Sequence, residues 1–130
     1  MSKIQNSEKM IQIVENYFSD VDSGNISSLL THLSSECELT VVTHQSKYTG
    51  RDREIKELFE RRLLNTNDAW HGNFMHLVDE DKGWVTSRFD VRRTDNKGYY
   101  REMHNINFFE FKDEKINKIF IWMSGESSLV

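Results

Sequence analysis

The chain has 130 residues and a formal net charge of −4, from 21 acidic and 17 basic residues. This length is typical of one domain, and no apolar run approaches the roughly 20 residues that a membrane-spanning helix needs. The excess of acidic residues argues against a nucleic-acid partner, because nucleic-acid binders usually carry a basic stripe.

The N-terminal segment, MSKIQNSEKM, lacks the apolar core of a signal peptide. The one cysteine, Cys37, fits a reducing compartment and permits neither an internal disulfide nor a zinc site of the CxxC kind. We therefore expect a cytoplasmic protein that contacts no membrane. No proline, Ser/Gly-rich linker or internal repeat divides the sequence, so residues 1–130 are predicted to form a single domain.

Three helices and one strand are predicted in the first half of the chain. Residues 4–22 carry apolar side chains at helical spacing, and Gly24 is expected to end this helix. Asn25 is expected to cap a short second helix, and the β-branched segment CELTVVTH at 37–44 predicts a strand. Asp52 is expected to cap a third helix. The segment RDREIKELFERR interleaves basic with acidic residues, which is typical of a solvated helix face.

From residue 69 onward the pattern changes to strands. Four long segments are separated by the turn sequences DEDKG, DNKG and KDEK, and they read AWHGNFMHLV, GWVTSRFDVRRT, YYREMHNINFFEF and INKIFIWM. Three helices followed by a meander of strands predict an α+β fold, with the helices packed on one face of a mostly antiparallel sheet.

Two uncharged polar residues interrupt the most hydrophobic of these segments. Asn105 and Asn107 lie two residues apart and therefore share one face of the predicted strand, with Phe109 following on the same face. A buried amide without a partner costs a few kcal/mol, so these side chains should face a cavity or another polar group.

Three local segments and the order of the elements resemble one known family over nearly the whole chain. VENYFSDVDSGNISSLL, YTGRDREI and FFEFKDEKI are similar to the SnoaL-like and ketosteroid isomerase-like branch of the nuclear transport factor 2-like superfamily. The resemblance implies a cone-shaped α+β barrel, in which three N-terminal helices pack on a curved sheet and leave a cavity open at one end. It also implies that many relatives form homodimers through the outer face of the sheet.

The resemblance suggests two donors for a developing oxyanion. Tyr17 matches a tyrosine that has this role in the ketosteroid isomerases, although a core tyrosine at the cavity rim fits the sequence too. Asn107 matches their second donor, a protonated aspartate, and an amide donates without any pKa shift. The alternative is that Asn107 only satisfies Tyr17 and orders the core. Asn105 would extend the same polar patch.

The ketosteroid isomerases use a carboxylate on the first strand as the base, and this chain has no carboxylate at the matching position. The matching position on the first strand is Val41, which has no proton chemistry and is expected only to line the pocket. Since some dehydratase-like and cyclase-like relatives use a strand histidine, His71 is the candidate acid or base, with a structural histidine as the alternative. Asn73 is expected to share its face. His71 and His76 are five residues apart and should face opposite sides, and we predict no metal site.

The last strand is apolar on both faces, so its orientation stays open at the level of sequence. Trp122 is expected as an apolar wall of the cavity, together with Phe109. If Asn107 faces inward, Ile106 and Phe108 face outward. With either Phe120 and Trp122 or Ile119 and Ile121 beside them, they predict a patch for a homodimer contact.

Two functions from different classes fit the sequence. One is a cofactor-free isomerase, cyclase, dehydratase or hydrolase that binds a small apolar or ring-containing molecule and acts by proton transfer. The other is a non-catalytic ligand-binding or dimerisation domain of the same fold, which the missing carboxylate at Val41 favours. A nuclear transport factor proper is a weaker third alternative, because no segment resembles a dedicated partner motif.

Overall fold

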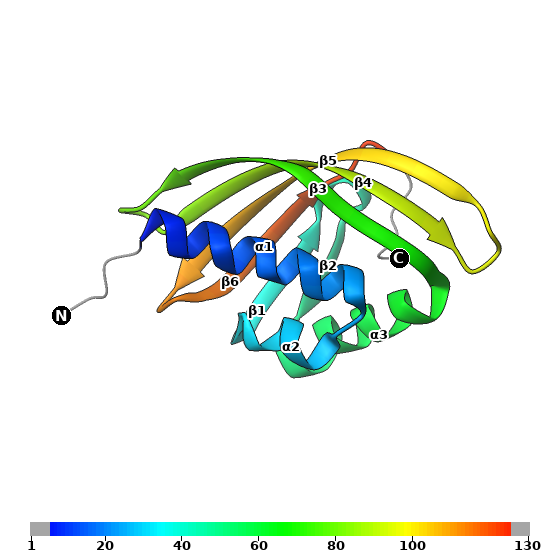
Figure 1. The fold of residues 1–130 in the computed structure, drawn as a ribbon. Helices are drawn as coiled ribbons and strands as arrows, with labels where there is room; N and C mark the ends of the chain where they lie inside the picture. The colour runs from blue at the N-terminus through cyan, green and yellow to red at the C-terminus, as the bar shows by residue number, and fades with distance from the viewer. Residues whose placement is uncertain (1–5, 126–130) are drawn as a thin grey trace.

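The computed structural model describes residues 6–125, in which three helices cover one face of a curved sheet (Figure 1). The helices are α1 (Ser7–Ser23), α2 (Ile26–Thr31) and α3 (Lys56–Asn65). The strands are β1 (Leu33–Val41), β2 (Ser46–Thr49), β3 (Thr66–Asp79), β4 (Trp84–Asp95), β5 (Tyr100–Lys112) and β6 (Lys115–Trp122). None of the helices in this part of the chain is long and apolar enough to cross a membrane.

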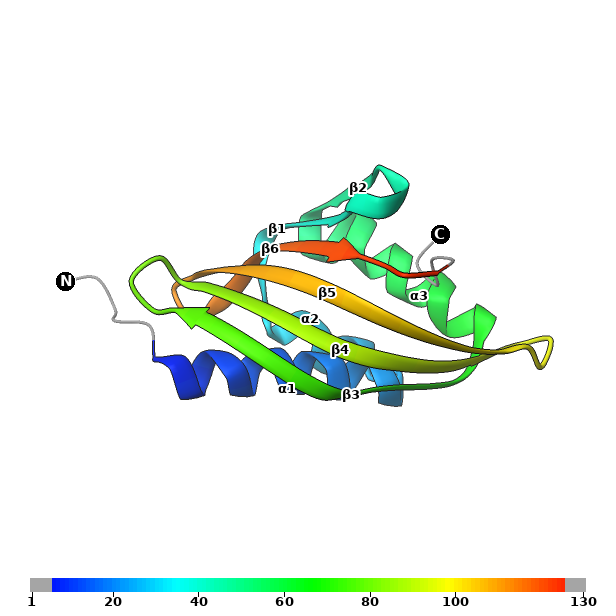
Figure 2. The ribbon, with the colours of Figure 1, turned by 90° about the horizontal axis from the view of Figure 1, so that it is seen from above.

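The sheet has the strand order β2-β1-β6-β5-β4-β3. Only the β1–β6 pair is parallel, and the other four pairs are antiparallel. The expected α+β fold with a mostly antiparallel sheet is therefore confirmed. The sheet remains open, since β2 and β3 form its two edges and do not pair with each other. It arches over α1, which runs along β3 (Figure 2).

The first two helices follow from local signals in the sequence. The side chain of Asn6 caps α1 by accepting from the backbone N–H of Lys9, and Gly24 ends the helix with a φ of 71°. Glycine suits this left-handed conformation because it has no Cβ. Asn25 then caps α2 by accepting from the N–H of Ser28, as expected.

The third helix and the first strand depart from expectation. Asp52 does not cap α3, because its carboxylate binds the Arg51 guanidinium and the helix begins only after a wide turn at Gly50–Ile55. The strand predicted at 37–44 ends at Val41. A short 3-10 turn then leads into β2, a strand that was not expected from the sequence.

A β-bulge in β3 decides which side chains reach the interior. The pairing with β4 shifts between Gly72 and Met75, and Asn73 in the bulge has a φ of 55°. The extra residue reverses the alternation of faces beyond it. His71 and His76 consequently both face α1, which corrects the expectation of opposite faces. A Cβ at Gly72 would lie 2.0 Å from the Trp70 ring, so a side chain there would require the indole to move.

The orientation of β6 is settled by burial. Ile119 and Ile121 are buried at 0% and 3% exposure, and they face the core beneath the helices. Phe120 and Trp122 alternate with them and face the outer side, where Trp122 is 43% exposed.

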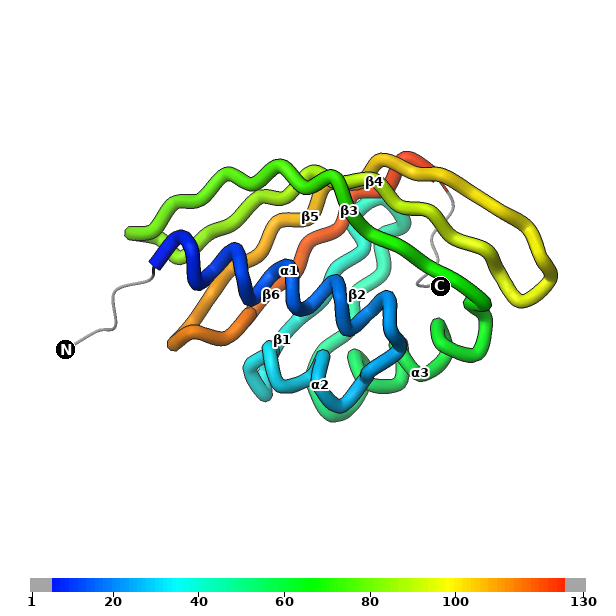
Figure 3. The backbone as a smooth tube through the Cα atoms, in the orientation of Figure 1, coloured from blue at the N-terminus to red at the C-terminus, as the bar shows by residue number. Residues whose placement is uncertain are grey.

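The tube in Figure 3 shows that the β4–β5 turn lies at the end of the sheet away from the start of α1.

Candidate active site

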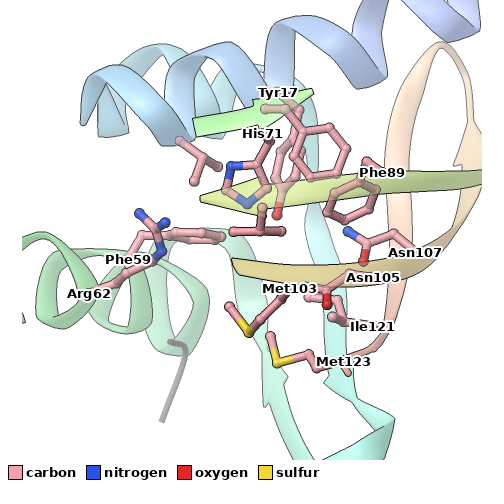
Figure 4. A pocket seen from close by; sticks show the side chains of 13 residues that line it. Tyr17, Phe59, Arg62, His71, Phe89, Met103, Asn105, Asn107, Ile121 and Met123 are labelled. Atoms are coloured by element: carbon pink, nitrogen blue, oxygen red, sulfur yellow. The ribbon is translucent and has the colours of Figure 1, made fainter. Parts of the chain in front are cut away.

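A small pocket lies between the helices and the inner face of the sheet, with a cavity volume of about 30 Å³ (Figure 4). A cavity of this size has room for about one or two water molecules. Most of its lining is apolar and aromatic, and the polar side chains that reach it are Tyr17, Arg62, His71, Asn105 and Asn107. The arrangement matches the general form of ligand sites, in which a few polar groups converge in an apolar cavity.

Tyr17 of α1 is held in place by aromatic neighbours. Its ring makes edge contacts with Phe18, Phe59 and Phe109, at centroid distances of 5.1, 6.2 and 5.8 Å. Burial raises the pKa of Tyr17, and the nearby Cys37 adds to this rise. The phenol therefore stays protonated at neutral pH and remains a donor. Within residues 6–125 its hydroxyl makes no hydrogen bond.

The two asparagines of β5 differ in how they are bonded. Asn105 Oδ1 accepts from the backbone N–H of Ser124 at 3.3 Å. Asn107 is 2% exposed, and its Oδ1 has no hydrogen-bond partner among the residues that the structure describes. Both line the pocket that Tyr17 borders. Asn107 thus carries an unused acceptor, and no hydrogen bond joins it to Tyr17 in this part of the chain.

His71 is oriented by Asp22, a residue that no pattern in the sequence singles out. The Asp22 carboxylate accepts from the backbone N–H of His71 at 2.8 Å and pairs with its Nδ1 at 2.5 Å. The imidazole packs on Phe18, with ring centroids 5.1 Å apart. Burial lowers the pKa of His71, and the interaction with Asp22 opposes part of that effect. The neutral ring donates Nδ1–H to Asp22, which leaves the lone pair of Nε2 as an acceptor.

Arg62 of α3 also borders the pocket, although its charged segment is typical of a solvated face. It is 6% exposed, and its Nη2 has no hydrogen-bond partner among the described residues. Burial lowers the pKa of Arg62, and the charge of Arg93 lowers it further. A signal in the sequence existed, because Arg62 lies four residues after Leu58 and three after Phe59, on the apolar stripe of the helix.

Four of the predicted site residues do not line the pocket. Val41 and Phe109 are fully buried in the core behind it. Asn73 is exposed, because the bulge turns it outward, and its Nδ2 donates to Asp90 at 2.9 Å. Trp122 lies on the outer face, which corrects its expected place as a cavity wall. The structure thus brings together Tyr17, His71, Asn105 and Asn107 and adds the unpredicted Asp22 and Arg62.

A second histidine joins α1 to the sheet below. His76 Nε2 lies 2.7 Å from Glu15 Oε2, and its Nδ1 lies 2.8 Å from Ser87 Oγ. The order carboxylate, imidazole, hydroxyl resembles a nucleophile triad. Ser87 is 0% exposed and lines no part of the pocket, so a substrate has no path to its hydroxyl. The chain of bonds instead fixes α1 on β3 and β4.

Within residues 6–125, no group of three or more His, Cys, Asp and Glu side chains is placed to hold a metal ion. Cys37 is buried, and burial raises the pKa of its thiol to about 12. A thiol of this pKa is not ionised at neutral pH and is a poor nucleophile. The polar side chains that line the pocket are able to form hydrogen bonds, and His71 is able to take up a proton.

Comparison with known proteins gives one family and a set of shared folds. The model of a family described as "Domain of unknown function (DUF8021)" matches residues 4–121. No curated protein sequence matches the chain.

Solved structures resemble the chain over most of its length. AusH from Aspergillus nidulans is 13% identical, with a TM-score of 0.81 over 95% of this chain and 88% of its own. A protein from Shewanella denitrificans OS-217, provisionally named a SnoaL-like polyketide cyclase, is 11% identical, with a TM-score of 0.79 over 88% and 90%. A protein with a ketosteroid isomerase-like fold from Catenulispora acidiphila DSM 44928, solved with trimethylamine, is 14% identical, with a TM-score of 0.77 over 90% and 88%.

At these identities the likeness concerns the fold alone. It confirms the expected fold of the SnoaL-like and ketosteroid isomerase-like branch of the nuclear transport factor 2-like superfamily.

Proposed function

The chain belongs to the DUF8021 family, and we propose that it binds a small, ring-containing molecule in the pocket and acts on it by proton transfer without a cofactor. The single observation that carries this proposal is the His71–Asp22 pair at the pocket. A neutral imidazole that is held in one tautomer by a carboxylate, with its second nitrogen free, is suited to abstract a proton near neutral pH.

The remaining polar groups have complementary roles in this proposal. Abstraction of a proton next to a carbonyl places negative charge on the carbonyl oxygen, which then needs hydrogen-bond donors. The Tyr17 hydroxyl and the Asn107 amide are such donors. His71 takes the place of the strand carboxylate that Val41 lacks, so the base comes from β3 instead of β1. Some isomerisations, cyclisations and dehydrations of carbonyl compounds begin with a step of this kind.

A ring needs more space than the pocket provides. A cavity of about 150 Å³ holds benzene, against the 30 Å³ found here. Met103 and Met123 form one side of the pocket in Figure 4. Methionine side chains are unbranched and adapt to new shapes, so we expect these two to move when a ligand enters.

Exchange of hydrogen for deuterium beside a carbonyl tests the proposal directly. Cyclohexanone and 2-cyclohexenone are incubated with the protein in D₂O, and loss of the α-proton signals is followed by NMR. We expect the protein to accelerate exchange above the buffer rate. If it accelerates exchange in neither ketone, nor in a panel of larger ring ketones, the catalytic proposal is wrong and the non-catalytic alternative holds.

Tyr17→Phe is expected to leave the fold nearly intact, because the hydroxyl makes no hydrogen bond in the described chain. The free energy of unfolding should change by less than about 1.5 kcal/mol. A ketone that accepts from the hydroxyl should bind about fivefold more weakly, which corresponds to roughly 1 kcal/mol for one hydrogen bond. Chemical denaturation and a ketone titration measure the two effects. Unchanged affinity would exclude Tyr17 as a donor to the ligand.

The alternative is a ligand-binding or dimerisation domain without catalysis, and the outer face of the sheet favours the dimer in either case. Trp84, Phe108, Phe120 and Trp122 follow one another across this face, with ring centroids 5.4, 6.1 and 6.5 Å apart. Ile106 beside them is 43% exposed. Exposed apolar patches of this kind usually mark an interface.

Phe108→Glu should therefore convert a dimer into a monomer. The substitution places a charge in the middle of the aromatic row, where a stable contact would bury roughly 800 Å² per partner. Size-exclusion chromatography with light scattering measures the change, and Lys56→Glu, an exposed position on α3 away from this face, is the control. A wild-type protein that is already monomeric at micromolar concentration contradicts the dimer.

The cytoplasmic location and the absence of a nucleic-acid partner also stay predictions.

A further inference from the structure

We propose that the ligand of this pocket carries a carboxylate and that Arg62 binds it. The inference rests on the proposed function only in placing the ligand in the same pocket. It adds a class of ligand, a small hydroxy-substituted carboxylic acid, that neither the fold nor the His71–Asp22 pair implies.

The first observation is a buried charge without a partner. Arg62 is 6% exposed, and none of the ion pairs or hydrogen bonds among residues 6–125 satisfies its Nη2. A buried charge is normally paired, because an unpaired one costs several kcal/mol. Here the guanidinium borders the pocket, so an anionic group of a ligand is in a position to pair with it.

The charged groups around Arg62 in the described chain do not supply the missing hydrogen-bond partner of its Nη2. Asp22 is the carboxylate whose charge acts on Arg62, but its oxygens are engaged by the backbone N–H and the Nδ1 of His71. Arg93 is a second buried cation close by, with its own bonds to Thr66 Oγ1 and Asn65 O. Asp95 acts on Arg93 as a counter-charge, whereas Arg62 Nη2 has no hydrogen-bond partner among the described residues, so a ligand carboxylate would complete its bonding.

A second unpaired group defines the other end of the ligand. Asn107 Oδ1 is a buried acceptor without a partner in the described chain. Figure 4 shows Arg62 and Asn107 on opposite sides of the pocket. A ligand that satisfies both needs a carboxylate at one end and a hydrogen-bond donor, such as a hydroxyl, at the other. The planar fork of arginine matches the two oxygens of a carboxylate, so it also fixes the ligand's orientation.

The test compares two compounds of nearly the same shape, 4-hydroxybenzoate and 4-hydroxybenzamide. They differ in charge at one end and keep the hydroxyl at the other. Calorimetric titration and thermal unfolding at pH 7 should show the acid binding at least tenfold more tightly than the amide and raising the melting temperature more. This comparison uses the wild-type protein and therefore depends on no variant folding correctly.

Two variants then assign the effect to Arg62. Arg62→Met should remove the preference for the acid, and its melting temperature without ligand should hold or rise, because a buried unpaired charge is removed. Arg62→Lys keeps the charge but loses the fork, so it should retain part of the preference. Equal binding of acid and amide by the wild type, binding of neither at millimolar concentration, or an undiminished preference in Arg62→Met would each overturn the proposal.

The outcome is independent of catalysis. Binding of the acid without exchange of ketone protons would refute the proton-transfer function alone. Exchange of ketone protons without any preference for the acid would refute the carboxylate alone.

Discussion

His71→Gln is expected to slow deuterium exchange in ring ketones by about 10²–10⁴-fold, the usual contribution of a positioned general base. Glutamine fills a similar volume but has no group that takes up a proton at neutral pH. The change is read as the initial exchange rate by NMR at fixed ketone concentration. Asp22→Asn should also lower the rate, because an amide no longer holds the imidazole in the tautomer that leaves Nε2 free.

His104→Gln is the matched control. Its side chain is 68% exposed on the outer side of the sheet, where Nδ1 pairs with Asp90 at 2.7 Å. This histidine also pairs with a carboxylate but lies outside the pocket, so its loss should leave the exchange rate unchanged. Equal losses in both variants would show that exchange does not arise in the pocket.

The direction of the His71 pKa predicts the pH dependence. Burial lowers this pKa below its ordinary value of 6.5, so the imidazole is neutral and active at pH 7. The exchange rate should rise with pH through that lowered pKa and then reach a plateau below neutrality. The free energy of unfolding should also increase with pH. Between the pKa of His71 in the folded state and 6.5, the unfolded chain binds more protons than the folded chain, so the free energy of unfolding rises with pH and levels off above 6.5.

Local patterns in the sequence predicted the order and type of most elements, because helix caps and hydrophobic alternation act over a few residues. Asn25 and Gly24 mark helix boundaries in both the sequence and the structure. The bulge at Gly72–Met75 escaped prediction, since it is defined by the register of pairing with β4, a partner far along the chain. One added residue moved Asn73 out of the site and brought His76 into the interior.

Part of the site was predicted, from the resemblance and from the alternation of faces along β5. Tyr17 and Asn107 line the pocket, as that resemblance implied. Asp22 and Arg62 were missed because charged residues near a helix end, or within a charged segment, usually face solvent. Their positions at the pocket depend on how α1, α3 and β3 come together, and that is a tertiary property. Trp122 was misplaced because the apolar side chains on both faces of β6 hide its orientation.

Asn107→Leu is expected to raise the free energy of unfolding by about 1–3 kcal/mol while weakening ligand binding by a similar amount. The amide contributes an acceptor, Oδ1, that is buried without a partner in the described chain, so the folded state gains little from it. Leucine removes this unsatisfied atom, and the adjoining cavity of about 30 Å³ gives room for the larger side chain. A ligand group that bonded to the amide would then be left unpaired.

Asn105→Leu is the matched control on the same strand and the same face. Asn105 Oδ1 already accepts from the Ser124 N–H, so its removal should lower stability by about 1 kcal/mol. Thermal and chemical unfolding of the two variants should therefore move in opposite directions. If Asn107→Leu is instead clearly destabilised, the amide ties the sheet to the helix, and its role as a donor to a ligand must be abandoned. Most of the case for an oxyanion site beside Tyr17 would be lost with it.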